Sequence, residues 1–99
     1  MAKYKLTNKA VDDLTQIWNY TVDKWLENQA DRYYQMIIDN CKEVASNHKL
    51  GKKYSGIAQH LLGFKTGRHI IFYRRIEEDE VEIIRILHGH MDLKNKIKE

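Results

Sequence analysis

The fold is decided by two blocks of the sequence, GRHIIFYR at residues 67–74 and VEIIRILHGHMD at residues 81–92. Both blocks are rich in β-branched and aromatic residues, which favour strands. The acidic run at 77–80 separates the two blocks, and Thr66-Gly67 separates the first from a further apolar stretch at 61–65. Breaks this short join neighbouring strands as hairpins, so the spacing predicts a three-stranded antiparallel meander.

Upstream of the meander, apolar residues recur with the period of a helix. Thr7 and Asn8 carry side-chain oxygens that can cap a helix running from Lys9 to near Leu26. The short alternating stretch at 3–6, before the cap, predicts an N-terminal strand. The apolar stripe of the helix places both tryptophans in the expected core: Leu14, Ile17, Trp18, Thr21 and Trp25.

A second helix follows after a very short connection at Glu27-Asn28, which predicts an antiparallel helical hairpin. Asn28 and Asp31 have the spacing of a capping box. Gly51 is expected to end the region in the left-handed conformation. The apolar stripe of this helix is the clearest in the chain, and it makes Cys41 an inert core thiol: Ala30, Tyr34, Ile37, Ile38, Cys41, Val44 and Ala45.

These elements predict an α+β fold with a single domain over residues 1–99. A short N-terminal strand precedes the helical hairpin, the hairpin packs on the three-stranded meander, and a short helical tail from Met91 ends the chain. Ninety-nine residues are enough for one core. The sequence contains neither a transmembrane-length apolar run nor a signal-peptide pattern, so we expect a cytoplasmic protein without membrane association.

Composition and motifs exclude several classes of function. The single cysteine excludes an internal disulfide framework and multi-cysteine zinc sites. The absence of a nucleophile elbow, a Gly-rich phosphate loop and a His-Glu-x-x-His helix argues against common hydrolases and NTPases. We expect no cofactor and no metal. The net charge of +3 is weak support for an acidic partner.

The predicted strands are apolar on both faces. Alternation places Ile71 and Tyr73 on one face and Ile70, Phe72 and Ile76 on the other. On the last strand, alternation places Val81, Ile83 and Leu87 on one face and Ile84 and Ile86 on the opposite face. The helical hairpin can cover only one face, which favours a partner site on the second. The alternative is that the loop at 52–60 and the C-terminal tail fold across it.

Two features of the last block can carry chemistry. Arg85 interrupts the apolar file of its strand, so it either presents a cation to a partner or pairs with a carboxylate such as Asp92 or one on a neighbouring strand. His88 and His90, two residues apart, can contact a nucleic acid or protein, form a hydrogen-bonded strand end or, less favoured, bind a metal.

The two C-terminal blocks also match a known pattern, together with positions of the first helix: Ala10, Asp13-Leu14, Ile17-Trp18, Tyr20 and Trp25. The chain resembles the ParE branch of the RelE/ParE toxin superfamily, whose closing signature is an aliphatic strand ending in Arg-x-Leu-His, then a small residue, a variable basic residue and Met-Asp. The chain departs from many relatives at three places. It has Asn47-His48 where they often have Asn-Pro, and His90 where many have Arg. Leu62 lies near the position of an Arg that relatives often carry before the Gly-Arg-His segment.

The resemblance implies the toxin of a type II toxin–antitoxin pair, neutralised by an acidic, ParD-like antitoxin whose C-terminal segment wraps the toxin. ParE-like members poison DNA gyrase and need no catalytic residue, whereas RelE-like members cut mRNA in the ribosomal A site. The tail at 91–99 lacks Tyr and Arg, and the net charge is only +3, so the gyrase-type activity is favoured and the ribosome-dependent endoribonuclease is the alternative. We expect no sequence-specific DNA binding by this chain alone.

The candidate site residues follow from these two activities. For partner binding they are Arg68, Tyr73, Arg74, Arg85, His88, His90 and Asp92. No catalytic residue is expected for a gyrase inhibitor. A RelE-like enzyme would need a base, an acid and cations for the charge that develops on the phosphate, and its candidates are Arg68, Arg85, His88 and His90.

Overall fold

The two C-terminal blocks form the centre of a single sheet in a computed structural model that describes residues 2–89 and 92–98. The elements are β1 (Lys3–Leu6), α1 (Asn8–Lys24), α2 (Glu27–Ser46), the 3-10 turn η1 (His48–Leu50), β2 (Lys52–Lys53), β3 (Leu62–Thr66), β4 (His69–Glu77), β5 (Glu80–His88) and α3 (Leu93–Lys98). The predicted α+β fold is therefore confirmed, and the predicted meander is β3-β4-β5.

The sheet has five strands in the order β1-β5-β4-β3-β2. β1 pairs in parallel with the first half of β5, from Lys3 opposite Glu80 to Leu6 opposite Ile83. At the other edge, the two-residue strand β2 pairs with the start of β3. β1 ends at Leu6, so the second half of β5, beyond Ile83, has no strand on that side.

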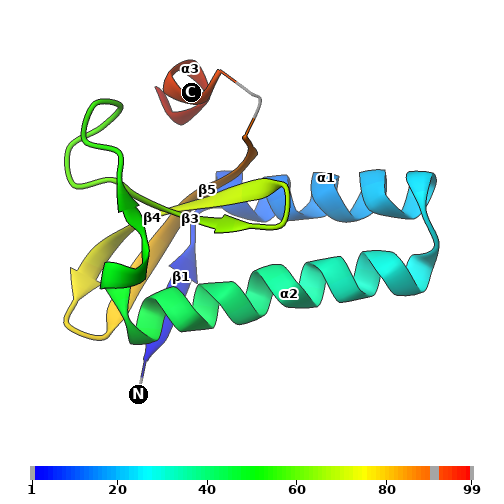
Figure 1. Ribbon diagram of the computed structural model, residues 1–99, viewed down its shortest axis with the longest axis horizontal. Helices are drawn as coiled ribbons and strands as arrows, with labels where there is room; N and C mark the ends of the chain where they lie inside the picture. The colour runs from blue at the N-terminus through cyan, green and yellow to red at the C-terminus, as the bar shows by residue number, and fades with distance from the viewer. Residues whose placement is uncertain (1, 90–91, 99) are drawn as a thin grey trace.

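The hairpin of α1 and α2 covers one face of the sheet, as Figure 1 shows. Thr7 caps α1 as predicted, because its Oγ1 accepts a hydrogen bond from the Ala10 N–H at 3.1 Å. The same hydroxyl donates to the Ile84 carbonyl at 2.7 Å and so ties the start of α1 to β5. The core between the helices and the sheet includes six residues with 0 % exposure: Ile37, Cys41, Val44, Ile71, Tyr73 and Ile83.

Two predictions about the ends of α2 are wrong. The helix begins at Glu27, with Leu26 at the cap position and no side-chain cap, so Asn28 already lies inside the first turn. Asp31 instead accepts a hydrogen bond from the Trp18 indole at 3.2 Å. Gly51 is extended, with φ of −77°, and glycine is needed there for space, since a Cβ would collide with the Tyr73 ring. Its N–H donates to the Tyr73 hydroxyl at 2.8 Å.

The second face of the sheet is covered by the chain itself. Leu61, Phe72 and Leu87 are buried there, and the packing around them comes from the loop residues Tyr54, Ile57 and Ala58, the strand residues Ile70 and Ile84, and Leu93 and Ile97 of α3. The prediction of an open partner surface on this face is wrong. The alternative is confirmed, because the loop and the tail provide the apolar cover that the face requires.

A β-bulge explains a second error in the assignment of faces. The register changes between Phe72, opposite Arg85, and Tyr73, opposite Ile83, which leaves Ile84 as an extra residue in β5. Alternation is interrupted there, so Ile83 and Ile86 both join the core under the helices while Leu87 joins the opposite cluster. Arg85 follows directly after the bulge.

The tryptophans are less buried than the stripe predicts. Trp18 is half-buried, and Trp25 is 60 % exposed because α1 ends at Lys24 and Trp25 has extended backbone angles. Tyr34, on the stripe of α2, is also exposed, whereas the burial expected for Cys41 is confirmed. Within residues 2–89 and 92–98, none of the helices combines the length and apolarity required to span a membrane.

Candidate functional site

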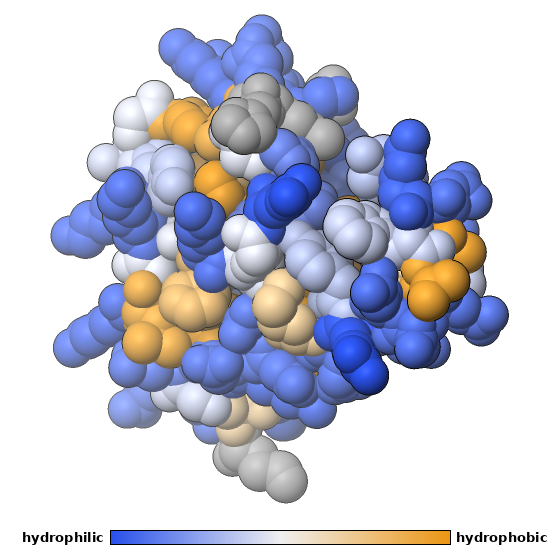
Figure 2. Space-filling view, turned by 45° about the vertical axis from the view of Figure 1, so that its right-hand side comes forward, coloured by the Kyte–Doolittle hydropathy of each residue, from blue (hydrophilic) through white to orange (hydrophobic). Residues whose placement is uncertain are grey.

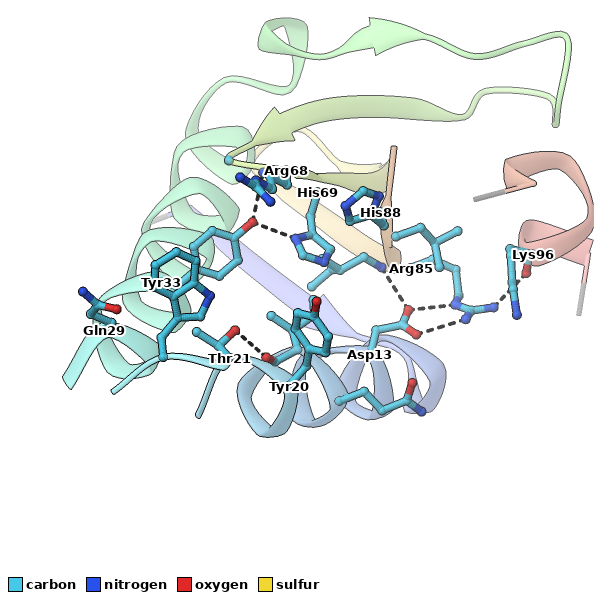
Figure 3. A pocket seen from close by; sticks show the side chains of 16 residues that line it. Asp13, Tyr20, Thr21, Gln29, Tyr33, Arg68, His69, Arg85, His88 and Lys96 are labelled. Carbon is cyan, nitrogen blue, oxygen red and sulfur yellow. Dashed lines mark hydrogen bonds and ion pairs between the residues drawn. The ribbon is translucent and has the colours of Figure 1, made fainter. Parts of the chain in front are cut away.

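A groove of about 800 Å³ lies between the helical hairpin and the ends of the strands. The helices contribute one wall and the β3–β4 turn with the end of β5 contributes the other, as Figure 3 shows. It is lined by Asp13, Gln16, Ile17, Tyr20, Thr21, Trp25, Gln29, Tyr33, Gly67, Arg68, His69, Arg85, Ile86, Leu87, His88 and Lys96. The volume is typical of ligand sites, and the lining mixes apolar, aromatic and cationic groups.

A buried ion pair between Asp13 of α1 and Arg85 of β5 forms one side of the groove (Figure 3). Arg85 Nε lies 2.8 Å from Asp13 Oδ2, and Arg85 Nη2 lies 3.0 Å from Asp13 Oδ1, which is the bidentate geometry that arginine favours. Both side chains are only 9 % exposed. The carboxylate neutralises Arg85, so the partner of this arginine is Asp13 on a helix and not Asp92.

Asp13 also completes the sheet. Its Oδ2 accepts a hydrogen bond from the Ile86 N–H at 3.0 Å, on the half of β5 where β1 has ended. The carboxylate therefore satisfies a backbone donor that no strand reaches. Arg85 reaches further, and its Nη1 donates to the Lys96 carbonyl of α3 at 2.7 Å. One ion pair thus connects α1, β5 and α3.

Tyr33, His69 and His88 form a second cluster in the groove. The Tyr33 hydroxyl lies 2.7 Å from His69 Nδ1 and accepts a hydrogen bond from the Arg68 N–H at 3.0 Å. The His69 ring packs edge-on against that of His88, with ring centroids 5.4 Å apart. Burial and, secondarily, the charge of His88 lower the pKa of His69 to about 4, so its imidazole is neutral at pH 7.

Exposed side chains lie on both walls of the groove. The Arg68 side chain is exposed, and its guanidinium has neither a hydrogen bond nor an ion pair with the rest of the described chain. At the other wall, Tyr20 is 64 % exposed and Trp25 is 60 % exposed, although both are large and mainly apolar. Figure 3 shows Tyr20 rising from α1 towards the histidines. These side chains are available to a partner without any rearrangement of the core.

The structure brings only some of the predicted residues together. Arg68, Arg85 and His88 line the groove. Tyr73 has 0 % exposure, lies in the core and donates from its hydroxyl to the His48 carbonyl at 2.8 Å, so it offers no surface to a partner. Arg74 is exposed outside the groove and pairs with Glu82 at 2.9 Å. His90 lies outside the described residues.

Asp92 has a structural contact at the start of α3. Its Oδ2 accepts a hydrogen bond from the Asn95 side chain at 2.6 Å, and its carbonyl accepts one from the Lys96 N–H at 3.0 Å. It is absent from the groove lining. Among the described residues, no group of three or more His, Cys, Asp or Glu side chains is placed to hold a metal ion.

Sequence reasoning missed Asp13, Tyr33 and His69 as members of the site. Asp13 lies four residues before Ile17, on the buried stripe of α1, and a carboxylate at a buried position requires a partner. That signal predicts a buried pair but does not name Arg85, which is 72 residues away in the sequence. Tyr33 and His69 meet only through the packing of α2 against the β3–β4 turn, for which the sequence gives no local signal.

Comparisons with known proteins identify relatives over almost the whole chain. Residues 4–93 match the family described as the ParE toxin of the type II toxin-antitoxin system parDE. The chain is 30 % identical over 92 residues to Toxin ParE1 of Caulobacter vibrioides, covering 93 % of this chain and 94 % of that protein. Toxin ParE1 of Mycobacterium tuberculosis is 29 % identical over the same coverage.

A solved structure shares the fold. It is a chain from the structure titled "Chromosomal ParDE TA system from P. aeruginosa", with a TM-score of 0.74 and 21 % sequence identity. The match covers 89 % of this chain and 96 % of the solved chain. The strand, helical hairpin and meander are therefore an arrangement already known from experiment.

Proposed function

The chain belongs to the ParE toxin family of type II toxin–antitoxin systems, and from that premise we propose that it binds and inhibits DNA gyrase and is neutralised by an acidic, ParD-like antitoxin. The toxin works by protein binding and carries no catalytic residue of its own. Its site of action is the cytoplasm. Of the predicted partner-binding residues, Arg68 and His88 contact the partner from the groove, which the paired Arg85 also lines.

The neutralised Arg85 is the observation that carries this proposal. RNA cleavage needs a free cation for the charge on the phosphate and a free base for the 2′-hydroxyl. Asp13 already neutralises Arg85, and the Tyr33 hydroxyl already occupies Nδ1 of His69. Of the endoribonuclease candidates, Arg68 keeps an exposed guanidinium, but Arg85 is held by Asp13, so the endoribonuclease alternative has one cation fewer for the phosphate and is disfavoured. An inhibitor that works by binding requires none of them to react.

The character of the groove supports a protein partner with acidic residues. Ile17, Tyr20 and Trp25 provide apolar contact area, and Arg68 adds a positive charge that has no ionic partner among residues 2–89 and 92–98. Complementary charge of this kind speeds association and selects the correct partner. The net charge of +3 acts in the same direction at longer range.

Two assays on one preparation test the proposal. Purified gyrase is assayed for DNA supercoiling with increasing amounts of the toxin, and programmed ribosomes are assayed for mRNA cleavage in the A site. We expect lost supercoiling or accumulated gyrase–DNA cleavage complexes, with intact mRNA. The same toxin premixed with its antitoxin is the control and should leave supercoiling normal. Cleaved mRNA, or normal supercoiling at saturating toxin, would overturn the gyrase proposal.

A further inference from the structure

We infer that the groove recognises the antitoxin by two separate contacts: a large apolar side chain held by Ile17, Tyr20 and Trp25, and a carboxylate bound by Arg68. The inference rests on the proposed neutralisation by an acidic antitoxin, and it assigns the residues that select that partner. It makes Arg68, and not the strand arginine Arg85, the cation that determines specificity.

The apolar contact follows from side chains whose exposure costs free energy. Tyr20 and Trp25 are 64 % and 60 % exposed, and both border the groove beside the buried Ile17. Figure 2 shows the end of the helical hairpin coming forward at the right, where one of several orange patches interrupts a largely blue surface. Aromatic side chains in such positions are enriched among the residues that dominate protein interfaces. A partner side chain packed here removes this apolar surface from water.

The ionic contact follows from the charges that remain after internal pairing. Asp13 neutralises Arg85, and lowering of its pKa keeps His69 uncharged at pH 7. The Arg68 guanidinium has no ionic partner in the described part of the chain, and it lies beside Gly67 at the turn that closes the groove. Its planar fork binds a carboxylate through two parallel hydrogen bonds.

A peptide fits these features better than a nucleic acid does. Nucleic-acid sites neutralise several phosphates with several exposed cations. In this groove the large exposed side chains include the aromatic Tyr20 and Trp25 as well as Arg68, and the strand arginine is already neutralised. An acidic peptide segment with one large apolar residue uses both contacts at once.

The test measures binding of the full toxin to the antitoxin encoded with it. Arg68→Ala should weaken the affinity by about tenfold or more, because the bound antitoxin covers the exposed Arg68 and its carboxylate, and losing one member of such a covered pair is costly. Arg75→Ala is the matched control, because Arg75 is an exposed arginine on β4 outside the groove, and its affinity should stay within about threefold of the wild type. An alanine scan of the antitoxin carboxylates should find one whose removal no longer matters in the Arg68→Ala toxin.

The apolar contact has its own readout. In a Trp18→Phe background, Trp25 is the only tryptophan, since the chain has two. Its fluorescence should shift to shorter wavelength when the antitoxin binds, and Tyr20→Ala should weaken binding. Thermal unfolding of each free variant confirms that the toxin itself remains folded.

Several outcomes would overturn the inference. Wild-type affinity in the Arg68→Ala variant, or unchanged Trp25 fluorescence in the complex, would place the antitoxin elsewhere while leaving neutralisation intact. A short single-stranded oligonucleotide that binds more tightly than the antitoxin, and only when Arg68 is present, would make the groove a nucleic-acid site. Failure of the wild-type toxin to bind the antitoxin at all would instead refute the proposed function.

Discussion

Replacing Asp13 by alanine should destabilise the protein as strongly as a large cavity in the core. The carboxylate accepts hydrogen bonds from Arg85 Nε at 2.8 Å, Arg85 Nη2 at 3.0 Å and the Ile86 N–H at 3.0 Å. Its removal leaves a 9 % exposed guanidinium with its charge uncompensated and a strand N–H without its acceptor. Breaking a buried pair in this way costs about 3–5 kcal/mol. That is a large share of the roughly 5–15 kcal/mol that stabilises a domain.

The assay is unfolding by urea and by heat, followed by circular dichroism. A loss of about 3 kcal/mol corresponds to a fall in Tm on the order of 12 °C or more for a domain of this size. Arg85→Ala should cost a similar amount, because it leaves the Asp13 carboxylate buried and unpaired. The double variant Asp13→Leu/Arg85→Met should recover much of the loss, since a well-packed apolar pair avoids the desolvation of two charges.

The double-mutant cycle decides between a structural pair and two independent residues. Strong coupling between the two substitutions would confirm that Asp13 and Arg85 act as a unit. If each single variant lost less than about 1 kcal/mol, as exposed ion pairs do, the burial argument would be refuted. Additive losses in the double variant would refute the pairing itself.

Three further predictions concern the core and the groove. Ile37→Ala should cost about 2–5 kcal/mol in urea unfolding, and the half-buried neighbour Ile38→Ala clearly less; equal losses would contradict the packing of α2. His69 should titrate near pH 4 by NMR. The pKa of a histidine in the unfolded chain is about 6.5, so below that pH the unfolded state takes up a proton that the buried imidazole does not. The contribution of His69 to the free energy of unfolding should therefore be complete above pH 6.5 and lost as the pH falls towards 4. His88→Ala should raise that pKa, and titration of wild-type His69 near 6.5 would show that its ring is not buried. Burial raises the pKa of Cys41 to about 12, so the thiol should react with Ellman's reagent only after unfolding; fast reaction in the native protein would contradict its burial.

The sequence predicts the elements of this fold well because each has a strong local signal. The helix periods, the Thr7 cap and the aliphatic strands all depend on residues close together in the chain. The errors occur where a distant contact decides the outcome. The need for glycine at position 51 comes from the Tyr73 ring, 22 residues away. Asp31 accepts a hydrogen bond from Trp18 across the helical hairpin and does not cap the start of its own helix.

The site was less predictable than the fold for the same reason. Alternation identifies the faces of a strand only while the pairing stays regular, and the bulge at Ile84 shifts every later residue of β5 relative to that pattern. The interrupted apolar file marks Arg85 as unusual, but the sequence points to Asp92 or a carboxylate on a neighbouring strand as its partner. The two ends of the actual pair are brought together only by the packing of α1 along β5.

One side chain connects the stability of this fold to its choice of partner. β1 is only four residues long, so the second half of β5 lies beside α1 and not beside a strand. Asp13 supplies the hydrogen-bond acceptor for β5 that a longer β1 would have provided. The same carboxylate removes the charge of Arg85 from the groove and leaves Arg68 to attract an acidic segment. A chain with this fold but a neutral residue at position 13 would leave the Arg85 charge without its carboxylate in a groove that His69 and His88 also line, at the cost in stability given above. Different activities on one scaffold therefore need no change of architecture, because a single carboxylate on α1 decides whether Arg85 can act as a binding cation in a groove that Arg68 and Lys96 also line.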